Sequence, residues 1–415
     1  MKKIPILIAG ATGLVGETMI RLLEERNFPV ERLLPVASAQ SAGKTVVFRG
    51  VDVPVITLEQ ALQTAPPGIA LFAASGSVSK MWAPLFVEKG WRVIDNSSYW
   101  RMKEEVPLVV PEINGHLLQP FHLSQPSHLL QPSHLLQPSN RLIANPNCST
   151  IQMVMALAPL HKAFGLQRVV AATYQSVSGS GRKGEAQLER ERTQAQQAQP
   201  KHKHNQNQQA QPELERTQTH SAQLEHEHTQ TYPVQLHTDT ASPYPCPIDL
   251  NVIPQIGDFL EDGYSEEERK MIDETKKIFN DSSIGVSATT VRVPVYGAHC
   301  VSLNVQLARP FTLEEVHRLL SSFPGVVLTD APEGPTQLHG PRSRPGLTSG
   351  REPALEYATP LTAKGTDAVY VSRVRRDPSI ENGLELWTVA DNIRKGAALN
   401  AVQIAEHLLT LKGSE

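Results

Sequence analysis

Short apolar runs separated by amphipathic segments dominate the first 150 residues of the chain. Residues 17–26 have the period of a helix that buries one face. Five runs have the length and composition of buried strands, namely Ile4–Ala9, Leu33–Val36, Leu71–Ala74, Trp91–Asp95 and Leu142–Ala144. Buried strands that alternate with helices predict an α/β fold with an open sheet. Ligands bind such sheets where the strands end.

A glycine-rich loop, Gly10-Ala-Thr-Gly-Leu-Val-Gly16, joins the first strand to the first helix. In this position glycines let the backbone approach a pyrophosphate, which then lies on the helix N-terminus. The spacing GxxGxxG departs from the commoner GxGxxG, and a plain turn is the alternative. The strand and helix on either side favour a Rossmann-type dinucleotide site.

No acidic residue follows the second predicted strand, where NAD enzymes place a carboxylate on the ribose. The segment instead contains Ser38, Ser41, Gly43 and Lys44, which suit a 2′-phosphate and therefore NADP. A plain polar loop is the alternative. Arg101, beyond the fourth strand, can pair with an anion, although a surface salt bridge explains it equally well.

The strand at Leu142–Ala144 leads through Asn145-Pro-Asn-Cys-Ser-Thr150 into an apolar helix over Ile151–Leu160. Cys148 therefore lies at or near the first helical residue. Unpaired N–H groups and the helix dipole are expected to lower the pKa of a thiol there and to favour the thiolate. A small residue that simply packs at the helix start is the alternative, and the local sequence leaves both open.

Two β-rich runs further along the chain end in polar residues. The run at Arg168–Tyr174 leads into hydroxyl and glycine residues up to Gly181, as expected where backbone passes close to a ligand. The run that begins at Val286 is predicted as a strand ending in His299. A buried structural role is the usual one for a single histidine, but cysteine chemistry needs a base.

Composition narrows the function classes. The chain has 415 residues, which is enough for two or three domains, and a net charge of −3, which gives no general attraction to nucleic acid or anionic membrane. No apolar run reaches the length of a membrane span, and the N-terminal run is too short for a signal peptide. Three cysteines form no disulfide framework. We therefore expect a cytoplasmic protein without nucleic-acid or membrane partners.

Two segments have the composition of inserts. Residues 116–139 repeat a six-residue unit with a proline in each copy, which excludes a helix or a central strand. Residues 190–242 are rich in Gln, His, Glu, Arg and Thr and are expected to be disordered, because few apolar residues offset the entropy of ordering. Metal binding by their histidines is the alternative, but the irregular spacing and the lack of cysteine disfavour it, and we predict no metal site.

Six blocks in one order along the chain resemble the aspartate-semialdehyde dehydrogenase family. They are Gly10–Gly16, Ile94–Ser98, Asn145–Thr150, Thr173–Gly179, Arg292–Val295 with His299, and Asp391–Ala401. The sequence departs from the family at Ala298 and Cys300, where Gly and Ser are usual, and at Gln40, where an Arg is common.

The resemblance implies a role for individual residues. Cys148 is the implied nucleophile, His299 the acid/base, and Gln175 a group that orients the substrate. The implied ligands of the substrate are Arg292 for the α-carboxylate, Glu267 for the α-ammonium, and Arg101 with Lys270 for the phosphate. The implied cofactor site comprises Gly10, Thr12, Gly13, Leu14, Val15, Gly16, Ser38, Ser41, Lys44, Ser75, Gly76, Ser178, Gly179 and Asn392.

Glu267 and Lys270 are three residues apart, so a helix would present both on one face. Without the resemblance, this segment has the composition of a solvated, charged helix start. We expect that simpler role for Glu266 and Glu268.

The resemblance also implies the organisation and the reaction. Residues 1–147 and 378–415 form the expected NADP-binding domain, and residues 148–377 an α+β domain for catalysis and dimerisation, in a homodimer or a dimer-based tetramer. The implied reaction is the NADP-dependent reduction of β-aspartyl phosphate to aspartate semialdehyde and phosphate, in the biosynthesis of lysine, threonine, methionine and diaminopimelate. The alternatives are N-acetyl-γ-glutamyl-phosphate reductase and a non-catalytic dinucleotide-binding protein.

Overall fold

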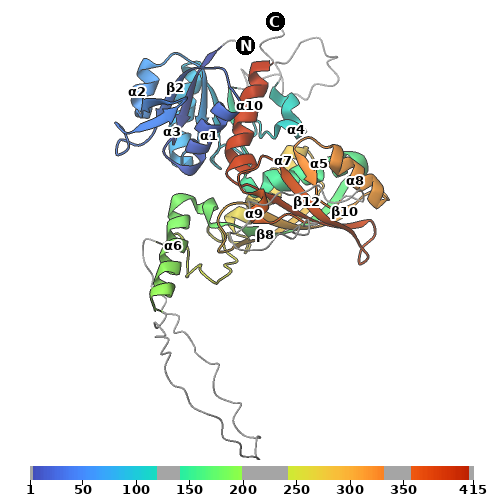
Figure 1. The fold of residues 1–415 in the computed structure, drawn as a ribbon. Helices are drawn as coiled ribbons and strands as arrows, with labels where there is room; N and C mark the ends of the chain where they lie inside the picture. Colours follow the sequence, from blue (N-terminus) through green and yellow to red (C-terminus); the bar gives the residue numbers. More distant parts are fainter. Residues whose placement is uncertain (1–2, 119–140, 199–241, 331–356, 411–415) are drawn as a thin grey trace, which may run out of the picture.

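A computed structural model of the chain describes residues 3–118, 141–198, 242–330 and 357–410 (Figure 1). The first sheet has five parallel strands in the order β2-β1-β5-β6-β7. They are β1 (Ile4–Ala9), β2 (Val30–Val36), β5 (Ile69–Phe72), β6 (Arg92–Asp95) and β7 (Leu142–Ala144). The predicted α/β fold is confirmed, because every apolar run of the first 150 residues forms one of these strands.

Helices cover both faces of the first sheet. α1 (Leu14–Glu25) and α10 (Leu399–Thr410) pack on one face, and α2 (Leu58–Thr64) and α3 (Gly76–Glu88) on the other. A hairpin of β3 (Thr45–Phe48) and β4 (Val51–Pro54) lies beside β2, and α4 (Pro111–Asn114) with a 3-10 turn at Gly115–Leu118 follows β6. Because the strands are parallel, all their carboxyl ends meet at one edge.

The second sheet has six strands in the order β11-β12-β13-β10-β8-β9. The strands are β8 (Leu166–Gln175), β9 (Gly285–Arg292), β10 (His299–Leu307), β11 (Val326–Leu328), β12 (Val369–Asp377) and β13 (Gly383–Ala390). The β8–β9 and β11–β12 pairs are parallel and the others antiparallel. This mixed sheet confirms the α+β character of the second domain.

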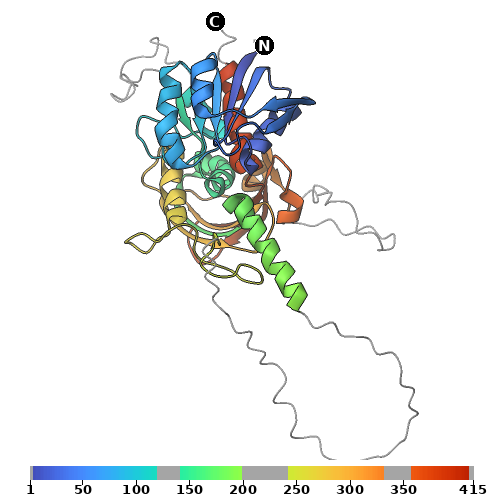
Figure 2. The same cartoon turned by 90° about the vertical axis from the view of Figure 1, so that its left-hand side faces the viewer.

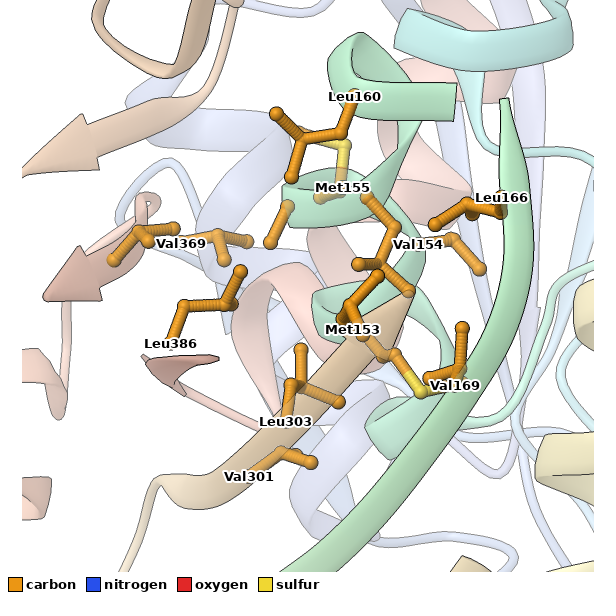
Figure 3. Close-up of a cluster of buried hydrophobic side chains, with 14 of the residues drawn as sticks. Met153, Val154, Met155, Leu160, Leu166, Val169, Val301, Leu303, Val369 and Leu386 are labelled. Atoms are coloured by element: carbon orange, nitrogen blue, oxygen red, sulfur yellow. The ribbon is translucent and has the colours of Figure 1, made fainter. Parts of the chain in front are cut away.

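One face of the second sheet packs against α5 (Cys148–Phe164), α7 (Glu266–Phe279) and α8 (Leu313–Ser322). Met153, Val154 and Met155 of α5 contact strand residues such as Val169 and Leu303 (Figure 3). α5 is apolar all round and 13 of its 17 residues are buried, so it is the central helix of this core. α9 (Pro360–Ala363) lies beside β13, and α6 (Gly181–Ala198) extends away from the sheet (Figures 1 and 2).

Two boundaries differ from the sequence prediction. A division at residue 378 assigns β13 to the first domain, but β13 pairs with β10 and β12 of the second sheet. Only the segment after it, including α10, packs on the first sheet. Residues 190–198 continue helix α6 and are not disordered, because Leu188 and neighbouring residues anchor α6 on Ile248 and Ile253. In the first predicted insert, residues 116–118 belong to the 3-10 turn Gly115–Leu118, in which Leu118 is buried in the core of the first domain. Residues 119–139 of that insert and 199–241 of the second lie outside the described residues.

Candidate active site

The glycine loop has the close contacts that a dinucleotide cradle requires. Gly10 has a φ of +83°, and a Cβ on it would lie 2.2 Å from the carbonyl oxygen of Ala73. A Cβ on Gly16 would lie 2.2 Å from the oxygen of Gly10. The N-cap residue of α1 is Gly13, which has no side chain to cap the helix. The first N–H groups of α1 at the carboxyl edge of the sheet are therefore not bonded to a capping side chain. This cradle fits a pyrophosphate.

The other predicted cofactor residues lie at the same edge or beside it. Ser38 and Ser41 form a turn after β2, in which the Ser41 N–H donates to the Ser38 oxygen, and Lys44 follows. Ser75 caps α3, with Gly76 as its first residue. Asn392 accepts a 3.0 Å hydrogen bond from the Ser178 hydroxyl, which brings two distant parts of the predicted cofactor site together.

Cys148 is the first residue of α5, as predicted; it forms no disulfide and the residue is half-buried. The preceding residue, Asn147, caps the helix, because its side-chain oxygen accepts from the N–H groups of Ser149 and Thr150. A Cβ on Gly396 would lie 2.9 Å from the Cβ of Cys148. Gly396 belongs to a π-helix at Arg394–Ala398, and a larger residue there would collide with Cys148.

The expected lowering of the pKa of Cys148 is wrong for the ligand-free site. Burial, reinforced by the carboxylate of Glu267, raises the pKa of this thiol to about 12. Arg292 and Arg101 oppose the shift but do not outweigh it. The backbone N–H of Ser149 also lowers the pKa, but this N–H donates to the side-chain oxygen of Asn147 as well. Cys148 therefore rests as a neutral thiol.

This pKa predicts how Cys148 reacts with iodoacetamide in the ligand-free protein. Because the pKa is raised, the thiolate is scarce at neutral pH, and the alkylation rate should increase about tenfold per pH unit without levelling off up to about pH 10. Mass spectrometry of the Cys148 peptide separates its reaction from that of Cys246. A plateau near neutral pH would contradict a thiol protonated at rest.

Three predicted residues form a row across the second sheet. Gln175, the last residue of β8, is paired in register with Arg292 at the end of β9 and with His299 at the start of β10. All three side chains are buried. His299 begins a strand and does not end one, because the residues that follow Arg292 form a separate turn in which Gly297 and Ala298 have positive φ. The glycine usual in the family would suit the position of Ala298.

His299 faces the site with one ring nitrogen. The backbone N–H of Ser176 donates to Nδ1 at 3.1 Å, which places the proton of the neutral ring on Nε2. Burial lowers the pKa of His299 to about 3, with Arg292 adding to the effect, so the ring is neutral. Among the described residues Nε2 has no hydrogen-bond partner, and the absent side chain of Gly179 leaves room beside it. The site therefore holds a free N–H donor.

Glu267 lies among polar groups beside the loop that precedes Cys148. Its Oε1 accepts from the Asn147 amide at 2.8 Å and from the Gln175 amide at 3.2 Å, and its Oε2 lies 3.5 Å from Nζ of Lys270. Burial alone would raise the pKa of Glu267, but Lys270, Asn147, Arg292 and Gln175 together lower it below its ordinary value. The carboxylate is therefore charged and can meet an ammonium group.

Two buried arginines complete the site. Nη1 of Arg292 donates to the Ser176 carbonyl at 2.7 Å and lies close to Gly179. Arg101 donates from Nη1 to Glu274 at 2.9 Å and from Nη2 to the Asn96 carbonyl at 2.8 Å. Its Nε has no partner among the described residues. Both side chains retain donors for an anionic ligand.

Two glutamates have roles that the sequence did not indicate. Glu268 is buried and not solvated, because it accepts from the N–H groups of Ser265 and Thr290 and so ties α7 to β9. Glu274 was missed altogether, yet it contacts Arg101 and the backbone N–H of Asn147, the residue before Cys148. A spacing of seven residues from Glu267 places Glu274 on the same helical face and is the signal that could have found it.

Comparisons with known proteins agree with this geometry. The family model of the semialdehyde dehydrogenase NAD binding domain matches residues 5–120, and that of the semialdehyde dehydrogenase dimerisation domain matches residues 157–395. Aspartate-semialdehyde dehydrogenase of Aquifex aeolicus is 39% identical over 404 residues, and the enzyme of Bacillus subtilis 38% over 409, with 97% or more of each chain covered. The crystal structure of aspartate semialdehyde dehydrogenase II of Vibrio cholerae complexed with ASA has a TM-score of 0.74, with 37% identity and 99% of both chains covered.

A glycine cradle at the edge of a parallel sheet, a cysteine at the start of α5 and a histidine on the second sheet together define a dinucleotide-binding oxidoreductase. Family models and full-length relatives make the class more specific. The chain belongs to the aspartate-semialdehyde dehydrogenase family.

Proposed function

We propose that the protein reduces β-aspartyl phosphate to aspartate semialdehyde with NADPH, through a thioester on Cys148. The observation that carries this proposal is the row of Gln175, Arg292 and His299 in the second sheet. Gln175 donates to the buried Glu267 carboxylate, which also accepts from Asn147 in the loop before Cys148. A thiol, two separate cationic groups and one carboxylate match an acyl phosphate that also carries an α-carboxylate and an α-ammonium.

Each charged group of this substrate has a complementary residue. Arg292 presents a planar guanidinium for two parallel bonds to the α-carboxylate, and Glu267 meets the α-ammonium. Arg101 and Lys270 bind the phosphate, with the Nε of Arg101 as the free donor. N-acetyl-γ-glutamyl phosphate has no free amine, so it would leave the buried Glu267 carboxylate without a cationic partner from the substrate. This mismatch disfavours the N-acetylglutamyl alternative.

The first chemical step forms the thioester. The Cys148 sulfur attacks the acyl carbon, a C–S bond forms, the C–O bond to phosphate breaks, and the thiol proton leaves with the phosphate. The Gln175 amide, held by Glu267, orients the acyl group. Splitting the reaction at this intermediate replaces one difficult step with two easier ones.

The second step forms the aldehyde. NADPH, when bound in the glycine cradle, supplies hydride to the thioester carbonyl carbon. The Nε2–H of His299 donates a hydrogen bond to the resulting oxyanion, where charge develops. Collapse of the oxyanion breaks the C–S bond, releases aspartate semialdehyde and returns the sulfur of Cys148, which takes up a proton.

Ser38, Ser41 and Lys44 lead us to expect a preference for NADP over NAD. No carboxylate follows β2 to bind the ribose 2′-OH, whereas two hydroxyls and a cation can meet a 2′-phosphate. We expect kcat/KM to be at least about tenfold higher with NADP, since charge-assisted bonds contribute about 1.5–3 kcal/mol. Steady-state kinetics with both cofactors, and with Lys44→Ala as the matched variant, checks this. A higher kcat/KM with NAD would contradict it.

The second sheet provides the surface for the proposed dimer. Helices α5, α7 and α8 cover one face, and the short helix α9 packs on part of the other. Tyr174 and Trp387 lie together on that second face, with ring centroids 5.6 Å apart and Tyr174 41% exposed. Apolar rings in such a position suit an interface between subunits. We expect a homodimer, or a tetramer of such dimers, in the cytoplasm. None of the helices that the structure describes is long and apolar enough to cross a membrane.

One comparison of substrates tests the proposed function. The protein should reduce NADP in the presence of phosphate and aspartate semialdehyde, the reverse of the biosynthetic reaction, and should not do so with N-acetylglutamate semialdehyde. Activity with the acetylated substrate alone would favour the other reductase, and activity with neither would favour a non-catalytic role.

In the proposed function, aspartate semialdehyde serves the synthesis of lysine, threonine, methionine and diaminopimelate.

A further inference from the structure

Glu274 of α7 is a buried carboxylate for which the proposed reaction has no direct use. Its side chain is 1% exposed. Oε1 accepts from Nη1 of Arg101 at 2.9 Å, and Oε2 accepts from the backbone N–H of Asn147 at 2.6 Å. Each oxygen therefore has a different donor. One donor is the predicted phosphate-binding arginine, and the other is the residue that precedes the nucleophile.

α7 holds both of these partners at a second point. Nζ of Lys277 donates to the backbone carbonyl of Arg101 at 2.7 Å, so the helix fixes Arg101 at its guanidinium and at its main chain. Glu267 accepts from the Asn147 side-chain amide, so Asn147 is also held at main chain and side chain. Asn147 in turn caps α5, which begins at Cys148.

We propose that Glu274 is a positioning residue that sets the distance between the phosphate-binding guanidinium of Arg101 and the sulfur of Cys148. The inference rests on the proposed function, because it assumes that the substrate phosphate binds Arg101. The acyl carbon and the phosphate of one substrate are joined by a single oxygen, so the sulfur and the guanidinium must be held in a fixed relation. A misplacement of about 1 Å costs about a hundredfold in rate.

The charge of Glu274 also has a predictable effect on phosphate. The carboxylate partly neutralises Arg101 and so limits how tightly the guanidinium holds an anion. Its removal should leave phosphate binding as strong or stronger while it disturbs the alignment of Cys148. If Glu274 only stabilised the fold, its substitution would weaken phosphate binding and lower kcat together.

Three variants separate the effect of Glu274 on the alignment of Cys148 and Arg101 from the effect of its charge on phosphate binding. Glu274→Gln keeps the volume, but its single oxygen can accept from only one of the two donors. Glu274→Asp keeps the charge, but it is one methylene too short to reach both. Asp273→Asn removes a neighbouring charge from the same helix, at a residue outside the site, and is the matched control.

Kinetics of phosphate-dependent oxidation of aspartate semialdehyde give the first readout. We expect kcat to fall about ten- to a hundredfold in Glu274→Gln and Glu274→Asp, while the KM for phosphate in Glu274→Gln stays the same or falls. The kcat and the KM for phosphate of Asp273→Asn should remain within about twofold of the values of the protein without substitutions. An unchanged kcat, or a KM for phosphate that rises as kcat falls, would overturn the inference.

Alkylation of Cys148 gives a second readout that needs no turnover and no phosphate. In Arg101→Lys, which keeps the positive charge that acts on Cys148, the loss of the guanidinium bond to Glu274 should change the alkylation rate of Cys148 severalfold, because Glu274 transmits the change to Asn147. This variant also tests the inference if Glu274→Gln does not fold. An alkylation rate equal to that of the unchanged protein would overturn the positioning role. If the protein without substitutions has no activity with aspartate semialdehyde, but the Arg101 variant still has an altered alkylation rate at Cys148, only the proposed function is contradicted.

Discussion

Replacement of Cys148 with alanine should reduce turnover at least about a thousandfold and leave dinucleotide binding intact. The sulfur of Cys148 forms the C–S bond of the proposed thioester, and no neighbouring side chain of the described site can replace it. The glycine cradle is at the edge of the first sheet and does not depend on the sulfur. Steady-state turnover and a fluorescence titration with NADPH measure the two effects separately.

Cys246→Ala is the matched control, because Cys246 is also a free, partly exposed cysteine but lies in the cluster that anchors α6. It should keep its activity within about twofold. Ordinary turnover by Cys148→Ala would exclude covalent catalysis at this residue. Loss of activity in both variants would show that cysteine substitution damages the fold in general.

The second large effect is expected at His299. Its removal in His299→Ala should lower kcat about a hundred- to a thousandfold, the usual contribution of a hydrogen-bond donor to a developing oxyanion. Because the Ser176 N–H occupies Nδ1, the donor is Nε2. His299→Gln can place an amide N–H near the position of Nε2 and should keep more activity than His299→Asn, whose amide corresponds to Nδ1.

The pH dependence of the unchanged protein tests the same assignment. The lowered pKa of His299, about 3, keeps the ring neutral at all higher pH values. The pH profile of kcat/KM should therefore show no histidine titration between about pH 5 and 8. A clear inflection near pH 6.5 that disappears in His299→Gln, or greater activity in His299→Asn than in His299→Gln, would contradict the neutral Nε2 donor.

The apolar pattern was sufficient for the first sheet and for the start of α5. Each buried strand there is a short apolar run, and Cys148 follows a turn that a Pro and an Asn define locally. The row of Gln175, Arg292 and His299 could not be derived in this way. More than 100 residues separate Gln175 from its strand neighbours, and no local pattern fixes the register between them. The sequence pattern indicated His299 as a candidate base, but only the family resemblance indicated Gln175 and Arg292.

The charges of α7 show a second limit of sequence reasoning. Glu268 and Glu274 belong to a helix whose composition is typical of a solvated surface. Their burial depends on partners from β9, from the segment after β6 and from the loop after β7, which come together only in the folded protein. The raised pKa of Cys148 has the same origin, because the local helix start favours a thiolate but burial next to Glu267 outweighs it.

The most direct test of the thioester is a reaction from which phosphate is left out. With aspartate semialdehyde and NADP alone, each active site should form one NADPH and stop, and the Cys148 peptide should gain the mass of one aspartyl group in place of the thiol hydrogen. Added phosphate should remove that group and restart turnover. Formation of NADPH without any mass change on Cys148 would contradict the account.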